Sequence, residues 1–190
     1  MRLGVLGEST AAGCGVNTHE EGFAGCMARE LGGRTRRPVG WEVVGQHGAT
    51  ARRIRYRLLP QLGEDLDVAV LLAGVNDVLT RRKPDQWGED LVAILEGLTT
   101  RARRVLVSGI PPFDAFPTIP TTLGRYLAAR ADALDAVSRR AIDQFPRATW
   151  VSTREFAPMG PDFFAEDRFH PSAAGYEQWA HTTAEHLERE

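Results

Sequence analysis

Ser9 is the first residue whose type and position could do chemistry. It lies in a turn of small residues at 7–13, directly after an apolar run at 3–6. A hydroxyl in such a turn can serve as a nucleophile, and its backbone N–H can face the same site. The alternative is structural, because serine commonly caps the amino end of a helix. Ser9 is therefore a candidate nucleophile that needs partners elsewhere in the chain.

An acid and a base stand three residues apart near the end of the chain, at Asp167 and His170. Within a turn, this spacing can bring the carboxylate onto one imidazole nitrogen and leave the other nitrogen free to act as a base. Taken alone, a histidine before a helix is more often a cap or a surface residue. Asp167 and His170 become candidate catalytic residues only if a nucleophile lies beside them.

Two further loops offer hydrogen-bond donors. Gly48 follows an apolar run at 41–44, where it can bring a bare backbone N–H close to a ligand or simply permit a turn. Asn76 follows the apolar run at 68–72, and its side-chain amide can donate to a developing oxyanion without acting as a base. An Asx turn is the structural alternative for Asn76.

The elements that must position these residues alternate along the chain between short apolar runs and helical patterns. Strands are predicted at residues 3–6, 41–44, 68–72, 104–108 and 149–151. Helices are predicted at residues 22–31, 50–62, 85–101, 122–145 and 172–187, the last with Pro171 in its first turn. We expect an α/β fold: a three-layer α/β/α sandwich with a five-stranded parallel sheet, forming one domain over residues 1–190. Ligands of such sheets bind beyond the carboxyl ends of the strands, where all the candidate loops lie.

In their order, these loops resemble the blocks of the SGNH hydrolase superfamily, also called GDSL esterases and lipases. The resemblance covers nearly the whole chain and implies a flavodoxin-like fold. It implies that Ser9 is the nucleophile and that Asp167 and His170 complete a catalytic triad. It also implies an oxyanion hole made by the N–H groups of Ser9 and Gly48 and by the Asn76 amide.

The first block departs from the family pattern, because Glu8 replaces the usual aspartate and Thr10 the usual leucine. The longer Glu8 carboxylate raises the question of how this loop is anchored and how Ser9 is oriented. In the second block both Gly45 and Gly48 are available, and Gly48 is preferred because the Gly-Ala-Thr that it begins resembles the family's Gly-x-Thr ending.

The activity that the resemblance implies is a serine esterase or acylhydrolase that cleaves small carboxylic esters through an acyl-enzyme, without a cofactor or a metal. An acyltransferase or thioesterase using the same site, and a catalytically degenerate binding module, remain as alternatives. The loop 111–123 supplies Phe113, Phe116 and Ile119 as candidates for one wall of a short acyl pocket.

Other classes fit less well. The nucleophile elbow of α/β-hydrolases, Gly-x-Ser-x-Gly, fails because Ala11 stands where its second glycine belongs. The stretch 7–13 lacks the Gly-Lys-Ser/Thr ending of a phosphate-binding loop. A metalloprotein is disfavoured because the histidines show no close ligand spacing in the sequence with either cysteine, Cys14 or Cys26.

Composition limits the partners. The chain has 190 residues, a formal net charge of -2 and 43% hydrophobic residues, which is typical of a globular protein and offers no overall attraction for nucleic acid. No segment has the apolar length for membrane insertion, and no export signal is seen, so we expect a cytoplasmic location. The sequence leaves the oligomeric state open, and whether Cys14 and Cys26 pair.

Overall fold

The protein is built around one sheet of five parallel strands. The computed structural model describes residues 1–156 and 160–187. In the sheet the strands follow the order β2-β1-β3-β4-β5. The strands are β1 (Arg2–Gly7), β2 (Gly40–Gly45), β3 (Leu66–Leu72), β4 (Ala102–Ser108) and β5 (Ala148–Val151). This parallel order, 2-1-3-4-5, is that of flavodoxin-like folds, so the predicted fold class is confirmed.

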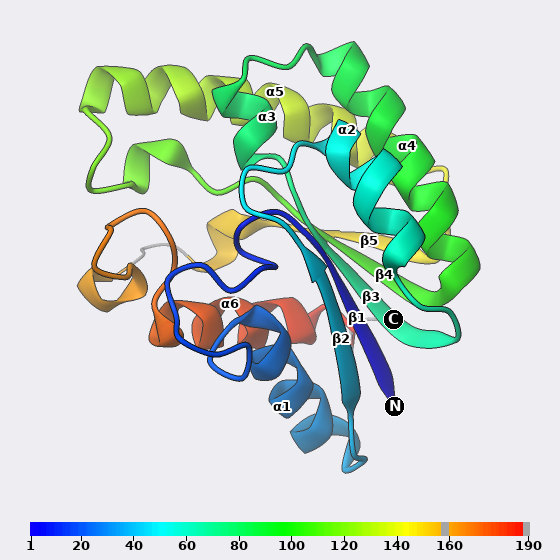
Figure 1. Ribbon diagram of the computed structural model, residues 1–190. Helices are drawn as coiled ribbons and strands as arrows, with labels where there is room; N and C mark the ends of the chain where they lie inside the picture. The colour runs from blue at the N-terminus through cyan, green and yellow to red at the C-terminus, as the bar shows by residue number, and fades with distance from the viewer. Residues whose placement is uncertain (157–159, 188–190) are drawn as a thin grey trace.

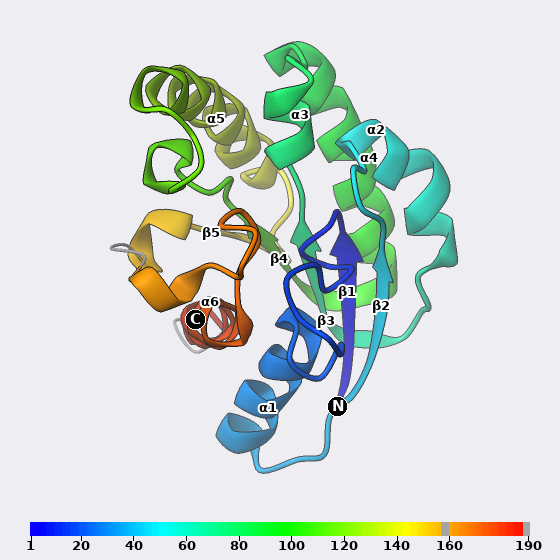
Figure 2. The ribbon, with the colours of Figure 1, turned by 60° about the vertical axis from the view of Figure 1, so that its left-hand side comes forward.

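Helices cover both faces of the sheet (Figure 1). Helices α1 (Phe23–Thr35) and α6 (Ala173–Glu185) pack together on one face. The other face carries α2 (Ala51–Arg53) with the irregular helical turns that continue it, α4 (Pro84–Arg101) and α5 (Thr121–Ile142). Figure 2 shows these two helix layers on either side of the strands.

Strand β3 shows why the sheet is buried on both faces. Val68, Val70 and Leu72 point to the core shared with α1 and α6, whereas Ala69 and Leu71 point to the core shared with α2, α4 and α5. Successive side chains of a strand alternate between the two faces, so a strand covered on both sides reads as a continuous apolar run. This is the pattern that marked 68–72 as a strand in the sequence.

The register of strands β1, β2 and β3 places their carboxyl ends, and the loops that follow them, side by side. Gly7 pairs with Gly45 of β2 on one side and with Leu72 of β3 on the other. Because these strands are parallel and end together, the loops that begin at residues 8, 46 and 73 all leave the sheet at the same edge. The tertiary structure therefore gathers segments that are far apart in the sequence.

Two local segments differ from what the sequence suggested. Asn76 lies in a short helix, α3 (Val75–Leu79), rather than in the Asx turn that was its structural alternative. Pro171 lies before α6 rather than in its first turn, because the Ser172 hydroxyl caps that helix by accepting a hydrogen bond from the Gly175 N–H at 3.2 Å. Within the described residues, no helix is both long and apolar enough to cross a membrane.

Candidate active site

Ser9, His170 and Asp167 form a continuous chain of hydrogen-bonding contacts at the carboxyl edge of the sheet. The Ser9 Oγ lies 3.1 Å from His170 Nε2, and His170 Nδ1 lies 2.6 Å from Asp167 Oδ2. An aspartate carboxylate only accepts hydrogen bonds, so Nδ1 carries the imidazole proton and Nε2 is left as the acceptor for the Ser9 hydroxyl. Ser9 is buried. Because Nδ1 holds the imidazole proton, Nε2 can accept the proton of the Ser9 hydroxyl.

The loop 167–170, which carries the acid and the base, is held by hydrogen bonds from its backbone to the Asp167 side chain. Asp167 Oδ1 accepts hydrogen bonds from the N–H groups of Phe169 and His170, each at 2.9 Å. Arg168, between Asp167 and Phe169, adopts a left-handed φ of 55°, which closes the turn. Although partial burial raises the pKa of Asp167, the hydrogen bonds from His170 and from these two amides outweigh it and lower the pKa below its ordinary value. The carboxylate therefore stays ionised opposite the imidazole.

Glu8 anchors the first loop to the start of α3. Its carboxylate is buried and accepts hydrogen bonds from the N–H groups of Val75 and Asn76, both at 3.1 Å, and from Asn76 Nδ2 at 2.7 Å. Burial raises the pKa of Glu8 to about 7, against the lowering effect of these hydrogen bonds. The longer side chain thus ties the loop of Ser9 directly to the loop of Asn76.

Backbone donors near Ser9 come from two loops. Among the described residues, neither the Ser9 N–H nor the Gly48 N–H has a hydrogen-bond partner. Gly48 has a left-handed φ of 73° and open space around the position of a Cβ. Gly45 is used differently, because a Cβ there would lie 2.5 Å from the Ala12 N, so this glycine lets the first loop pack against β2.

The Asn76 amide is already engaged in this structure. Besides its bond to Glu8, Nδ2 donates to the Ala49 carbonyl at 3.2 Å, and these two bonds account for both amide hydrogens. To donate to a ligand, Asn76 would have to release one of them, and the longer bond to Ala49 is the weaker.

Asp77, the neighbour of Asn76, stabilises the loop after β2 that carries Gly48. It is buried, and its Oδ2 accepts the Ala51 N–H at 2.8 Å, which holds the end of the loop that bears Gly48. Burial raises the pKa of Asp77 to about 6. Its contacts are those of a structural residue.

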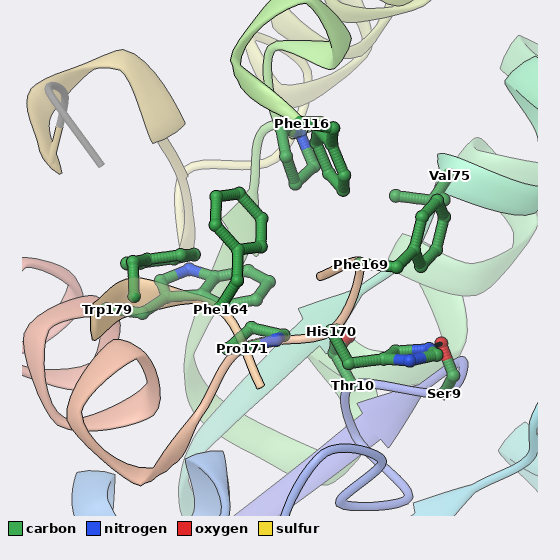
Figure 3. A pocket seen from close by; sticks show the side chains of 11 residues that line it. Ser9, Thr10, Val75, Phe116, Phe164, Phe169, His170, Pro171 and Trp179 are labelled. Carbon is green, nitrogen blue, oxygen red and sulfur yellow. Dashed lines mark hydrogen bonds between the residues drawn. The ribbon is translucent and has the colours of Figure 1, made fainter. Parts of the chain in front are cut away.

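An apolar pocket opens beside Ser9 and His170. Figure 3 shows these two side chains at one side of it, with the rings of Phe116, Phe164 and Phe169 facing the same space. The residues that complete the lining are Thr10, Val75, Pro111, Phe163, Pro171 and Trp179. The volume of the pocket in which the centre of a water molecule can lie is about 20 Å³. This is enough for roughly one water molecule.

The pocket wall differs from the sequence expectation. Only Phe116 of the three proposed residues lines it, because Phe113 is fully buried and stacks on Phe116 from behind, with ring centroids 5.4 Å apart. Ile119 packs against the core instead. The other aromatic rings come from Trp179 on α6 and from residues 163–169, which contact α6.

Sequence reasoning also missed Cys14 and His47 as neighbours of the site. The Cys14 Sγ lies 3.7 Å from His47 Nδ1, and the two rings of His47 and His170 are 5.9 Å apart between centroids. Burial, and secondarily the charge of Asp167, raises the pKa of the Cys14 thiol, so it is not an activated nucleophile beside Ser9. Cys14 and Cys26 are both free. The ligand spacing considered in the sequence could not reveal a cluster assembled from three loops.

Fold and site together define an α/β/α protein with a hydrogen-bonded serine, histidine and aspartate at the carboxyl edge of a parallel sheet. The family model described as GDSL-like Lipase/Acylhydrolase matches residues 5–178. The chain therefore belongs to the GDSL-like lipase/acylhydrolase family, and the predicted resemblance is confirmed.

Individual relatives are distant. The chain is 26% identical over 183 residues to the GDSL-like esterase Rv1075c of Mycobacterium tuberculosis, covering 93% of this chain and 58% of that protein's length. The crystal structure of TesA matches with a TM-score of 0.76 at 21% identity, over 99% of this chain and 98% of that one. A variant of Axe2, an acetyl-xylooligosaccharide esterase from Geobacillus Stearmophilus, matches with a TM-score of 0.73 at 16% identity, over 100% and 94% of the two chains.

Proposed function

We propose that the protein is a serine esterase that hydrolyses small carboxylic esters with short acyl groups through an acyl-enzyme on Ser9. The observation that carries this proposal is the chain of contacts from Ser9 Oγ through His170 to Asp167, with distances of 3.1 and 2.6 Å. Membership of an esterase and lipase family and likeness to solved esterases support it.

The proposed mechanism follows from the protonation states of the site. Ser9 Oγ attacks the ester carbonyl while His170 Nε2 takes its proton, and Asp167 stabilises the imidazolium that forms. The N–H groups of Ser9 and Gly48, which have no partner among the described residues, donate to the oxyanion, and the Asn76 amide joins them if it leaves Ala49. His170 then protonates the leaving alcohol, and water hydrolyses the acyl-enzyme with His170 again as the base.

The size of the pocket supports a short acyl group. Its room for roughly one water molecule matches the methyl group of an acetyl ester whose carbonyl lies at Ser9, whereas a long chain would have to displace several aromatic rings. One of the similar structures is an acetyl-xylooligosaccharide esterase, whose name specifies an acyl group of this size.

A series of p-nitrophenyl esters tests the substrate class. We expect the highest kcat/KM for acetate or propionate and a steady decrease toward longer acyl chains. We expect EDTA not to lower the rate, because no step uses a metal. A kcat/KM that rises steadily to long chains would refute the proposed acyl size.

An organophosphonate probe tests the nucleophile separately from the substrate. Covalent labelling of the wild-type protein, lost in the Ser9→Ala variant, supports an acyl-enzyme on Ser9. A folded wild-type protein that resists labelling and hydrolyses none of the esters would instead be a binding module that has kept the fold and lost the activity.

A further inference from the structure

Cys14, His47 and His170 bring three metal-binding side chains together beside Ser9. Each offers one ligand atom, and these atoms all lie within 4.8 Å of one another. The three residues come from the loop after β1, the loop after β2 and the loop before α6, so only the fold assembles them. A thiol and two imidazoles are ligands that zinc prefers, whereas magnesium and calcium prefer oxygen.

The distance between the Cys14 and His47 ligand atoms suits a tetrahedral ion. Zinc bonds of about 2.3 Å to sulfur and about 2.0 to 2.1 Å to nitrogen place these two ligand atoms about 3.6 Å apart at a tetrahedral angle. The Cys14 Sγ and His47 Nδ1 are 3.7 Å apart. These two side chains therefore need almost no movement to share an ion.

His170 is prepared as the third ligand by its contact with Asp167. Asp167 holds Nδ1 at 2.6 Å, so an ion would bind Nε2 and displace the Ser9 hydroxyl, which lies 3.1 Å from that nitrogen. A carboxylate on the far nitrogen of a histidine ligand orients the ring and increases its basicity in many zinc sites. The imidazole that is polarised to accept a proton is equally polarised to bind a cation.

The backbone holds Cys14 against the His170 loop. Gly15 has a left-handed φ of 98°, and a Cβ on it would lie 2.3 Å from the Pro171 carbonyl and 3.1 Å from His170 Cβ. The Tyr176 hydroxyl donates to the Cys14 carbonyl at 2.6 Å. His47 is exposed and Cys14 half-buried, so an ion can enter from solvent without opening the core.

We propose that Cys14, His47 and His170 form a binding site for Zn²⁺ and that an ion bound there inhibits the enzyme. Zinc sheds bound waters, forms bonds to the Cys14 sulfur and to one nitrogen of each histidine, and the thiol proton leaves to solvent. The bond at His170 Nε2 occupies the lone pair that would accept the Ser9 proton, so the nucleophile is no longer activated. The inhibition rests on the proposed esterase function, whereas metal binding does not.

Metal binding is tested directly with CoCl₂ on the purified, EDTA-dialysed protein. Cobalt bound to a thiolate gives a charge-transfer absorption, which we expect in the wild-type protein, weakened in His47→Ala and absent in Cys14→Ser. Cys26→Ser is the matched control, because Cys26 is the other free cysteine and lies buried on α1. A wild-type protein without this absorption, or a Cys14→Ser variant that keeps it, would overturn the site.

Inhibition is tested by titrating ZnCl₂ into the p-nitrophenyl acetate assay. We expect zinc to inhibit the wild-type enzyme, EDTA to restore it, and MgCl₂ to have no effect. Cys14→Ser and His47→Ala should keep their basal rates and need about tenfold or more zinc for half inhibition, whereas Cys26→Ser and His181→Ala should match the wild type. Equal sensitivity of all five proteins would refute the inhibitory role. Absence of any esterase activity without zinc would instead refute the proposed function, and the cobalt spectrum would still decide the site.

Discussion

Glu8 offers a quantitative test of how the first loop is held. The residue is 2% exposed, and burial raises the pKa of its carboxyl from the usual 4.5 to about 7. A group that binds its proton more tightly in the folded state stabilises that state fully below its unfolded pKa and loses this contribution as the pH rises through the folded pKa. The contribution of Glu8 to the unfolding free energy should therefore be full at acid pH and be lost progressively between pH 4.5 and about pH 7.

The magnitude follows from the shift. Each pKa unit corresponds to about 1.4 kcal/mol, so the shift from 4.5 to about 7 amounts to about 3 kcal/mol of unfolding free energy. Glutamine has no proton to lose and resembles the protonated form of Glu8 in shape and charge. Relative to wild type, Glu8→Gln should thus gain about 3 kcal/mol between about pH 4 and about pH 8.

Urea denaturation at a series of pH values measures this difference. The quantity to compare is the unfolding free energy of wild type minus that of Glu8→Gln, extrapolated to water at each pH. Asp135→Asn is the control, because Asp135 is also buried and its pKa is also raised to about 7. Asp135 accepts a hydrogen bond from the Ile110 N–H and shares no hydrogen bond with Glu8. This variant should lose its own pH dependence and keep that of Glu8. An equal pH dependence in wild type and Glu8→Gln would refute the reasoning.

Further variants separate chemistry from structure. Ser9→Ala should remove nearly all hydrolysis, about a million-fold in kcat, while its thermal unfolding stays close to wild type, and substantial turnover by the purified variant would contradict its role as nucleophile. Asn76→Ala should lower kcat about a hundred- to a thousand-fold, whereas Asp77→Ala should mainly lower the melting temperature. A larger loss of kcat in folded Asp77→Ala would reverse these two assignments. Gly15→Ala should lower the unfolding free energy by about 1 to 3 kcal/mol and reduce kcat, because the new Cβ would displace the loop before α6. Gly33→Ala is the control, because Gly33 lies on the open surface of α1 and its substitution should reduce neither stability nor kcat.

Local patterns in the sequence were sufficient for the architecture. The alternation of apolar runs and helical spacing predicted the five strands of the parallel sheet and its two helix layers, because the period of buried side chains is a local property. The order of the blocks predicted the family, and the three-residue spacing of Asp167 and His170 predicted their contact. These features depend on residues that are close in the chain or that recur in a fixed order.

Contacts between distant loops were decided only by the tertiary structure. The link from Glu8 to α3 spans 67 residues, and the contact between Cys14 and His47 spans 33, so no spacing in the sequence reports either of them. The aromatic rings of the pocket beside Ser9 come mainly from residues 163–169 and from Trp179 rather than from 111–123, because the packing of α6 places these residues near Ser9. Whether such side chains meet depends on strand register and helix packing, which the whole chain determines together.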